Sequence, residues 1–349
     1  MHENDGSGLT SRRKFIQYLA MLGVGGQALL RSGSLKAAVT EARESVGAGL
    51  PWPTMRYQKL GRTNYNASRL VFGCGAALSR QPRDDLLDTA LEAGVNVFDV
   101  GTSRYYDKAE IHLAPFLKKN RDKILVISKA GVYLDVGPNE PISLEQARTA
   151  AKTWLGLMDE SLRELDVDHV DAYYQMGANN PHVVGSDELY AAFQKAKQAG
   201  KVTYLGLSTH ENAQAVLESA IQTGWYDLAT IAITPAGWYD WVNKSLLEGS
   251  PDMAGLQPLL TRAREAGIGL IGMKAGRYIA GRRFLGWGNP RAFDEYYSEE
   301  LLRSDLSAFQ RSYAYVLEHG LDAVNADMQS IAHLKENFAA AATSRQYFA

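Results

Sequence analysis

From residue 70 onward the sequence repeats a single pattern, in which short apolar runs alternate with amphipathic segments of about ten to twenty residues. Parallel strands must be joined by a long crossover, usually a helix, so this alternation is typical of repeated strand–helix units. Eight such runs are enough to close a ring of strands. We therefore predict an α/β fold, a (β/α)8 TIM barrel. The expected strands cover residues 70–74, 95–99, 124–129, 169–175, 203–207, 228–233, 268–273 and 321–325.

Signals at the ends of the expected elements support this prediction. Ser143 is a suitable N-cap for a helix over 143–165, and Gly200 ends one over 187–199. Two short runs, 56–60 and 67–70, flank a Gly-Arg-Thr-Asn turn and predict an N-terminal β-hairpin that closes the barrel bottom. A doubly wound sheet has the same local signature, but no G-x-G-x-x-G follows the first strand.

Composition excludes several classes of protein. With 349 residues, 46% of them hydrophobic, the chain can bury a large core as one barrel domain. Its 37 basic and 39 acidic side chains give a net charge of -2, so we expect no nucleic acid partner. Cys74 is the single cysteine, and no Cys or His spacing suits zinc, so we expect neither a disulfide nor a metal.

The first forty residues resemble a twin-arginine export signal. Ser-Arg-Arg-Lys-Phe-Ile-Gln at 11–17 precedes an apolar stretch too short to span a bilayer stably. A basic helix start that happens to contain two arginines is the alternative. We expect a signal peptide over 1–40, a linker over 41–54 and the barrel over 55–349. The resemblance implies a bacterial periplasmic protein, exported folded by the twin-arginine machinery and without a stable membrane anchor after processing.

Barrel enzymes place their chemistry at the carboxyl ends of the strands, where side chains from several strands converge. Four polar residues stand at such ends here. They are Asp99, Lys129, Ser208 and Lys274.

Three segments of the sequence resemble the aldo-keto reductases in their order and approximate spacing. They are Val-Phe-Asp at 97–99, Tyr-Asp-Lys-Ala-Glu at 106–110 and Ile-Ser-Lys at 127–129. The resemblance extends from about residue 55 to 341, through segments 57–63, 199–202, 206–210, 272–274 and 336–337. It implies an oxidoreductase that moves a hydride between a nicotinamide cofactor and a small carbonyl or alcohol substrate.

The chemistry explains why these residue types would be needed together. Hydride addition to a carbonyl leaves an alkoxide that needs a proton, and an ordinary tyrosine, with a pKa near 10, holds its proton tightly. A neighbouring ammonium lowers that pKa. We assign Tyr106 as general acid and base, Lys129 as the ammonium and Asp99 as the carboxylate that holds it. Tyr105 is a rival, although the Asp-x-x-Glu that follows favours Tyr106.

Family members usually carry a histidine after the fourth strand, where this chain has Met176. A thioether cannot donate a hydrogen bond to the substrate oxygen. His182 or Gln175 are possible substitutes. Met176 also motivates an alternative, a catalytically impaired barrel that binds a nucleotide or sugar, and a third reading is an isomerase or lyase that uses Lys129 covalently.

The resemblance also implies the cofactor site and, less directly, the substrate wall. Asp327 and His333 stand where cations often hold a 2′-phosphate, which favours NAD(H) over NADP(H). Aromatic residues after the sixth and seventh strands predict an apolar or sugar-stacking substrate wall, made of Trp238, Tyr239, Trp241, Tyr278, Phe284 and Trp287. The cofactor residues implied are Ser208, Thr209, Met273, Lys274, Ala275, Gly276, Met328, Ser330, His333, Glu336 and Asn337.

Overall fold

A computed structural model describes residues 52–280 and 288–348 of the chain. The expected signal peptide, most of the expected linker, and the aromatic residues Phe284 and Trp287 lie outside the described residues. No helix within the described ranges is both long and apolar enough to cross a bilayer.

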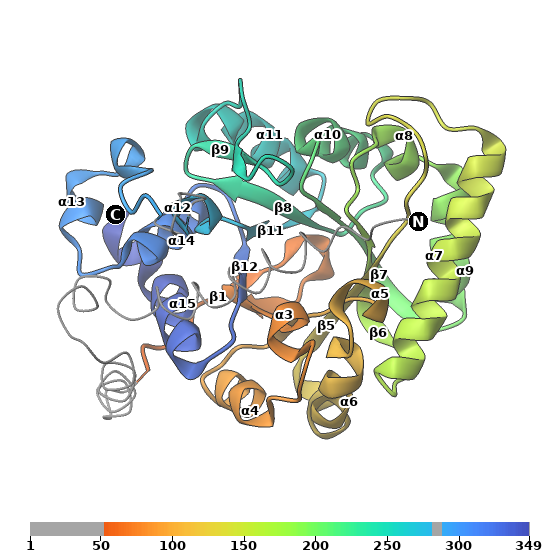
Figure 1. Cartoon of the computed structure of the whole chain (residues 1–349), viewed down its shortest axis with the longest axis horizontal. Coiled ribbons are helices and arrows are strands. Elements are labelled where there is room, and N and C mark those ends of the chain that lie inside the picture. Colours follow the sequence, from red (N-terminus) through yellow and green to blue (C-terminus); the bar gives the residue numbers. More distant parts are fainter. Residues whose placement is uncertain (1–51, 281–287, 349) are drawn as a thin grey trace, which may run out of the picture.

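Eight parallel strands close on themselves, because β12 pairs with β3 and β7 pairs with β8. Helices surround the ring (Figure 1). The predicted TIM barrel is therefore confirmed, with every expected strand present within about two residues of its expected place. In order around the ring the strands are β3 (Leu70–Gly73), β4 (Val97–Asp99), β5 (Leu125–Gly131), β6 (Val170–Met176), β7 (Val202–Thr209), β8 (Leu228–Thr234), β11 (Gly269–Met273) and β12 (Ala323–Asp327).

The helices begin where the sequence signals place them. Ser143 caps the longest one, since its hydroxyl accepts the Gln146 N–H while the Gln146 side chain accepts the Ser143 N–H. The helices are α3 (Cys74–Leu78), α4 (Asp84–Glu92), α5 (Ser103–Tyr106), α6 (Ala109–Asn120), α7 (Leu144–Glu164), α8 (Pro181–Val184), α9 (Asp187–Gln198), α10 (Ala213–Thr223), α11 (Met253–Glu265), α12 (Arg277–Ala280), α13 (Glu299–Arg303), α14 (Ala308–Glu318) and α15 (Ile331–Thr343).

The predicted hairpin also exists and closes the barrel bottom. Strands β1 (Tyr57–Lys59) and β2 (Asn66–Ser68) pair antiparallel around the short 3-10 helix η1 (Gly61–Thr63). Leu60 is fully buried among the side chains that fill the barrel interior. The Arg62 N–H donates to the Gly267 carbonyl at 2.7 Å, which ties the turn to the start of β11.

A repeated polar contact fixes the register of alternate strands at the same end. A side-chain oxygen of Asn96, Asp171, Asp227 or Asp322, at the start of β4, β6, β8 or β12, accepts one backbone N–H at 2.7–2.9 Å, from the hairpin strand β2 in the case of Asn96 and from the preceding barrel strand in the other three. Each contact satisfies a backbone donor where the ladder begins. The four contacts together stabilise the end of the barrel at which the strands begin.

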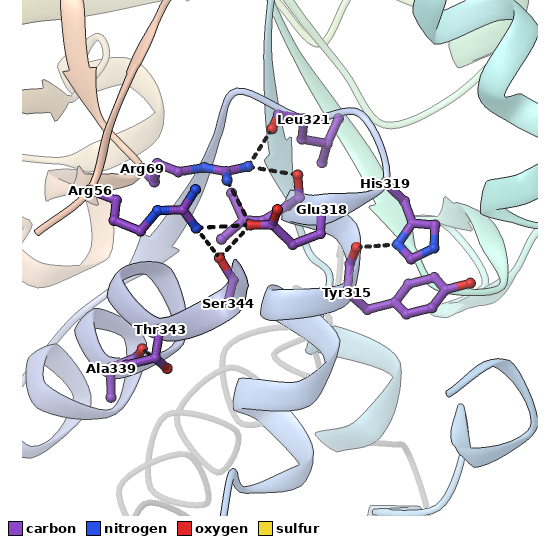
Figure 2. A network of polar contacts seen from close by, with 10 residues as sticks. Arg56, Arg69, Tyr315, Glu318, His319, Leu321, Ala339, Thr343 and Ser344 are labelled. Carbon is purple, nitrogen blue, oxygen red and sulfur yellow. Dashed lines mark hydrogen bonds and ion pairs between the residues drawn. The ribbon is translucent and has the colours of Figure 1, made fainter. Parts of the chain in front are cut away.

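A buried ion pair lies at this end too, between Arg69, directly before β3, and Glu318, at the end of α14 (Figure 2). Their atoms are 2.7 Å apart, and Arg69 also donates to the carbonyls of Leu317 and Leu321. Arg56 and Ser344 contact the same Glu318 oxygen, at 3.3 and 2.6 Å. The carboxylate thus connects the first strand region to the last helices.

Candidate active site

Strand alternation aims a set of side chains into the barrel mouth. Val97, Ile127 and Tyr174 lie in the cluster that fills the barrel interior. Side chains two positions apart on a strand share a face, so Asp99, Lys129 and Met176 point to the same side one layer higher. The strands thereby bring these predicted site residues to one end of the ring.

Lys129 is held by two acceptors at the ends of β4 and β5. Its Nζ lies 2.5 Å from Asp99 Oδ2 and donates to the Val100 carbonyl at 2.6 Å. The side chains of Lys129 and Asp99 are only 7% and 9% exposed. Asn325, on β12, donates to the same Asp99 oxygen at 2.6 Å, a contact that sequence reasoning missed.

Tyr106, at the end of α5, lies beside this pair. Its ring centroid is 5.5 Å from Lys129 Nζ, and two glycines make room for the ring. A Cβ on Gly101 would lie 3.1 Å from the ring, and one on Gly75 would collide with it. Tyr105 instead is 40% exposed and contacts the Tyr106 ring edge-on at 4.8 Å. The structure therefore brings Tyr106, rather than Tyr105, to Lys129.

The electrostatics differ from our expectation for this tyrosine. Burial raises the pKa of Tyr106 well above its usual value of 10, and the Asp99 charge raises it further. The net shift is therefore upward, opposite to the fall that we expected from the Lys129 ammonium. The main reason is that the folded chain buries the phenol, and the Asp99 carboxylate beside Lys129 adds to the rise.

Met176 is buried at the end of β6, and neither proposed substitute stands beside it on the inner face. Gln175 alternates to the opposite face, where its side chain contacts the Tyr226 phenol. His182 belongs to α8, where its backbone N–H is capped by the Asn180 side chain. Met176 and Gln175 both line a small cavity with Tyr133 and the turn after β6.

On the other side of the mouth, three cations surround one indole. Trp241 follows β9 (Gly237–Asp240), which pairs with the end of β8 and with the short strand β10 (Ser245–Leu246). The distances to the centroid of the Trp241 ring are 3.0 Å from Lys244 Nζ, 4.6 Å from Lys274 Nζ and 5.7 Å from the Arg277 guanidinium carbon. Sequence reasoning named Lys274 but missed Lys244 and Arg277, since nothing local marks them as neighbours.

The crowding of positive charge affects two titratable groups. Burial, and after it the nearby Arg277 charge, lower the pKa of Lys274 to about 8. Burial also lowers the pKa of His210 to about 3, with Lys274 and Lys129 contributing, so His210 is a neutral imidazole. Its ring lies 5.3 Å from that of Trp241. This side of the mouth suits an anion.

The predicted nicotinamide contacts divide into two groups. Ser208 is buried on the inner face, and its hydroxyl makes no hydrogen bond within the described residues. Met273 lies in an inner cluster with Ala232 and Tyr239. Thr209, by contrast, alternates outward and donates to the Glu211 carbonyl. The orphaned Ser208 hydroxyl and the inward Met273 fit a nicotinamide ring, whereas the Thr209 side chain is used elsewhere.

The predicted phosphate and adenosine contacts are also divided. Ala275 and Met328 are fully buried, and Gly276 packs closely on Phe309, so side chains at these positions serve the core. The last segment presents polar groups around the start of α15. Ser330 caps that helix by accepting the His333 N–H, Glu336 accepts the Ser307 hydroxyl at 2.6 Å, and Asn337 is half-buried one position later.

Sequence reasoning missed that Glu110, the last residue of the 106–110 segment, is a buried titratable acid behind the mouth. Glu110 is fully buried, and burial raises its pKa to about 7. The Ser128 hydroxyl donates to Glu110 at 2.6 Å and accepts the Lys129 backbone N–H at 2.7 Å. Glu110 therefore supports the strand that carries Lys129 from the helix side.

The family model for the aldo/keto reductases matches residues 69–273, more than half of the chain. The chain belongs to the aldo/keto reductase family. The prediction of an oxidoreductase of this type is thus confirmed, as is the coarser prediction of NAD(P) dependence. The matched range begins at Arg69 and ends at Met273, so it includes the strands that carry Asp99, Lys129, Met176 and Ser208.

This aldo/keto reductase is similar to the uncharacterised oxidoreductases YqkF and YrpG of Bacillus subtilis. YqkF is 26% identical over 83% of this chain and 92% of its own, and YrpG is 26% identical over 65% and 69%. Two solved structures share the fold: an aldo-keto reductase from Klebsiella pneumoniae in complex with NADPH and the holo form of AKR11C1 from Bacillus halodurans. Their TM-scores are both 0.57, with 19% and 21% identity over 82% and 84% of this chain, and 89% and 95% of theirs.

Proposed function

We propose that this aldo/keto reductase reduces a small carbonyl compound to an alcohol, with Tyr106 as the proton donor. The observation that carries the proposal is the convergence of Tyr106, Lys129 and Asp99 at the barrel mouth, beside the orphaned Ser208 hydroxyl. Convergence of acid, cation and carboxylate at the carboxyl ends of barrel strands is typical of catalysis.

A reduced nicotinamide, when bound, supplies hydride to the carbonyl carbon. The residues that would hold it are Ser208 at the carboxamide, Met273 against the ring, and the cations Lys274 and Arg277 at the pyrophosphate. A cationic rim complements phosphate oxygens, and both cations lie against the same indole.

Tyr106 gives its proton to the developing alkoxide oxygen and recovers one from solvent afterwards. With its pKa raised, the phenol is protonated at neutral pH, the form that reduction uses, but it is a weaker acid than an ordinary tyrosine, so proton transfer depends on stabilisation of the phenolate. Lys129, fixed by Asp99 and Val100, supports the phenolate as it forms. This proposal does not require covalent chemistry at Lys129, whose amine is held in an ion pair.

The test is consumption of reduced nicotinamide with para-nitrobenzaldehyde, an electron-poor probe, by the wild type, Tyr106→Phe and the matched control Tyr105→Phe. We expect Tyr106→Phe to lose on the order of 10²- to 10⁴-fold in kcat, the usual range for one acid–base group. Tyr105→Phe should keep wild-type activity. Dinucleotide binding without turnover across an aldehyde and ketone panel would favour the impaired binding barrel that Met176 suggested.

Cofactor choice is the finer part of the proposal. Asp327 is held by Gln329 at 2.9 Å near the start of α15, where a 2′-phosphate would meet its negative charge. We therefore expect tighter binding of NADH than of NADPH in fluorescence titrations. Tighter NADPH binding would reverse this choice while leaving the carbonyl chemistry intact.

A further inference from the structure

Tyr133 occupies an unusual place at the mouth, directly above the ends of β5 and β6. It is 74% exposed, more than the other large hydrophobic side chains at the described surface. Its hydroxyl makes no hydrogen bond to the described residues. An exposed aromatic ring with a free polar tip at the entrance to a site is suited to meet a ligand.

Two glycines form a shelf for this ring. A Cβ on Gly131, the last residue of β5, would lie 2.6 Å from the Tyr133 ring. A Cβ on Gly177, which follows Met176, would lie 3.9 Å from the Tyr133 hydroxyl oxygen. Because Gly131 pairs with Met176 across the two strands, the ring folds back over the strand end and brings its hydroxyl to the residue after Met176.

Tyr133 is also coupled electrostatically to the proposed proton donor, since its charge contributes slightly to raising the pKa of Tyr106, after burial and the Asp99 charge. Tyr133 and Met176 line the same small cavity. His210, the other polar candidate at the mouth, instead packs on Trp241 among the cations. Tyr133 is therefore a hydroxyl donor that lies beside Met176 at the strand ends.

We propose that the Tyr133 hydroxyl donates a second hydrogen bond to the substrate oxygen, in the role that Met176 cannot fill. This inference rests on the proposed function. During reduction Tyr106 transfers its proton to the oxygen, while Tyr133 keeps its own and stabilises the negative charge that develops there. Closure of the ring over a bound carbonyl would also shield that oxygen from water.

The experiment compares Tyr133→Phe with the wild type on para-nitrobenzaldehyde, with Tyr105→Phe as the matched control from the same rim. Removing one oxyanion donor costs on the order of 10²-fold in kcat. We expect a loss of that size for Tyr133→Phe, an unchanged Kd for the reduced dinucleotide, and wild-type kcat for Tyr105→Phe. Gly131→Ala, which keeps the hydroxyl but fills the shelf, should lower kcat as well.

Rescue makes the test specific. Met176→His in the Tyr133→Phe background returns a donor to the same oxygen, and we expect it to restore kcat at least about tenfold. A Tyr133→Phe variant with wild-type kcat, or one whose loss is entirely in dinucleotide affinity, would overturn the inference. If Tyr106→Phe loses activity and Tyr133→Phe does not, this inference alone is wrong. If the wild type shows no turnover, both the proposed function and this inference are wrong.

Discussion

Two buried ion pairs stand at opposite ends of the same barrel and are nearly matched in geometry. Lys129 and Asp99 lie 2.5 Å apart at the mouth, with side chains 7% and 9% exposed. Arg69 and Glu318 lie 2.7 Å apart at the bottom, with side chains 7% and 14% exposed. Distance and burial therefore do not distinguish a functional ion pair from a structural one. The groups that surround each pair make the distinction.

The surroundings differ in how completely polar groups are satisfied. At the bottom, Arg69 also meets two carbonyls and Glu318 also meets Arg56 and Ser344, so that only the Arg69 Nε of this pair lacks a partner within the described residues (Figure 2). At the mouth, the hydroxyls of Ser208 and Thr230 have no partner within the described residues, and cations crowd together. An unsatisfied buried polar group costs free energy, so a cluster of them marks a place where a ligand supplies the missing partners.

The largest expected effect comes from breaking the pair at the mouth. Lys129→Met removes the ammonium that supports Tyr106, so we expect kcat to fall on the order of 10²- to 10⁴-fold. The measurement is turnover of reduced nicotinamide with para-nitrobenzaldehyde, alongside circular dichroism to confirm folding. A folded Lys129→Met protein with more than a tenth of wild-type kcat would show that this pair is structural like the other.

Breaking the pair at the bottom should act on stability instead. Arg69→Met leaves Glu318 buried with only partial compensation, so we expect the free energy of unfolding to fall by about 3–5 kcal/mol. The readout is urea denaturation, with kcat measured well below the unfolding transition and expected to match the wild type. Arg303→Met is the control, since its pair with Glu299 is about four-fifths exposed on both sides and should contribute about 0–1 kcal/mol.

The sequence predicted the barrel well because strand and helix periods are local signals. Its errors are of about two residues and fall at both ends of strands; β5 and β7, for example, end two residues later than expected. Strand β4 begins at Val97 rather than at residue 95, and β12 at Ala323 rather than 321, because Asn96 and Asp322 act as side-chain clamps before the ladder begins. An apolar run does not reveal where a neighbouring strand's N–H needs an acceptor.

The site was predictable where a residue follows a strand and unpredictable where a loop folds back. Asp99 and Lys129 could be named because they end apolar runs. Asn325 contacts Asp99 across the ring closure, and Tyr133 returns over its own strand end, so no spacing in the sequence relates either to its partner. The direction of the Tyr106 pKa shift was missed for a similar reason, because it depends first on how deeply the folded chain buries the phenol and then on the nearby Asp99 charge.

The smallest expected effect tests the crowded cations at the mouth through pH. Lys274, with its pKa lowered to about 8, is a cation below that pH and increasingly neutral above it. A pyrophosphate binds the charged form better, so dinucleotide affinity should be full near pH 7 and fall as pH rises through 8, by about tenfold for a loss of about 1.4 kcal/mol. Because the bound phosphate in turn favours the ammonium, the fall should continue above pH 8 until the complex itself titrates.

The measurement is the Kd of NADH by fluorescence across this range, in the wild type and in Lys274→Gln. The variant lacks the titrating group and should bind weakly with a flat profile between pH 7 and about 9. If the variant keeps the same slope, another group is responsible; if wild-type affinity rises with pH, the cluster does not hold an anion. Either result would weaken the physical contrast between the two ends of the barrel, since the mouth cations would then not be the groups that hold a ligand's phosphates, and Arg69 at the bottom is already paired with Glu318.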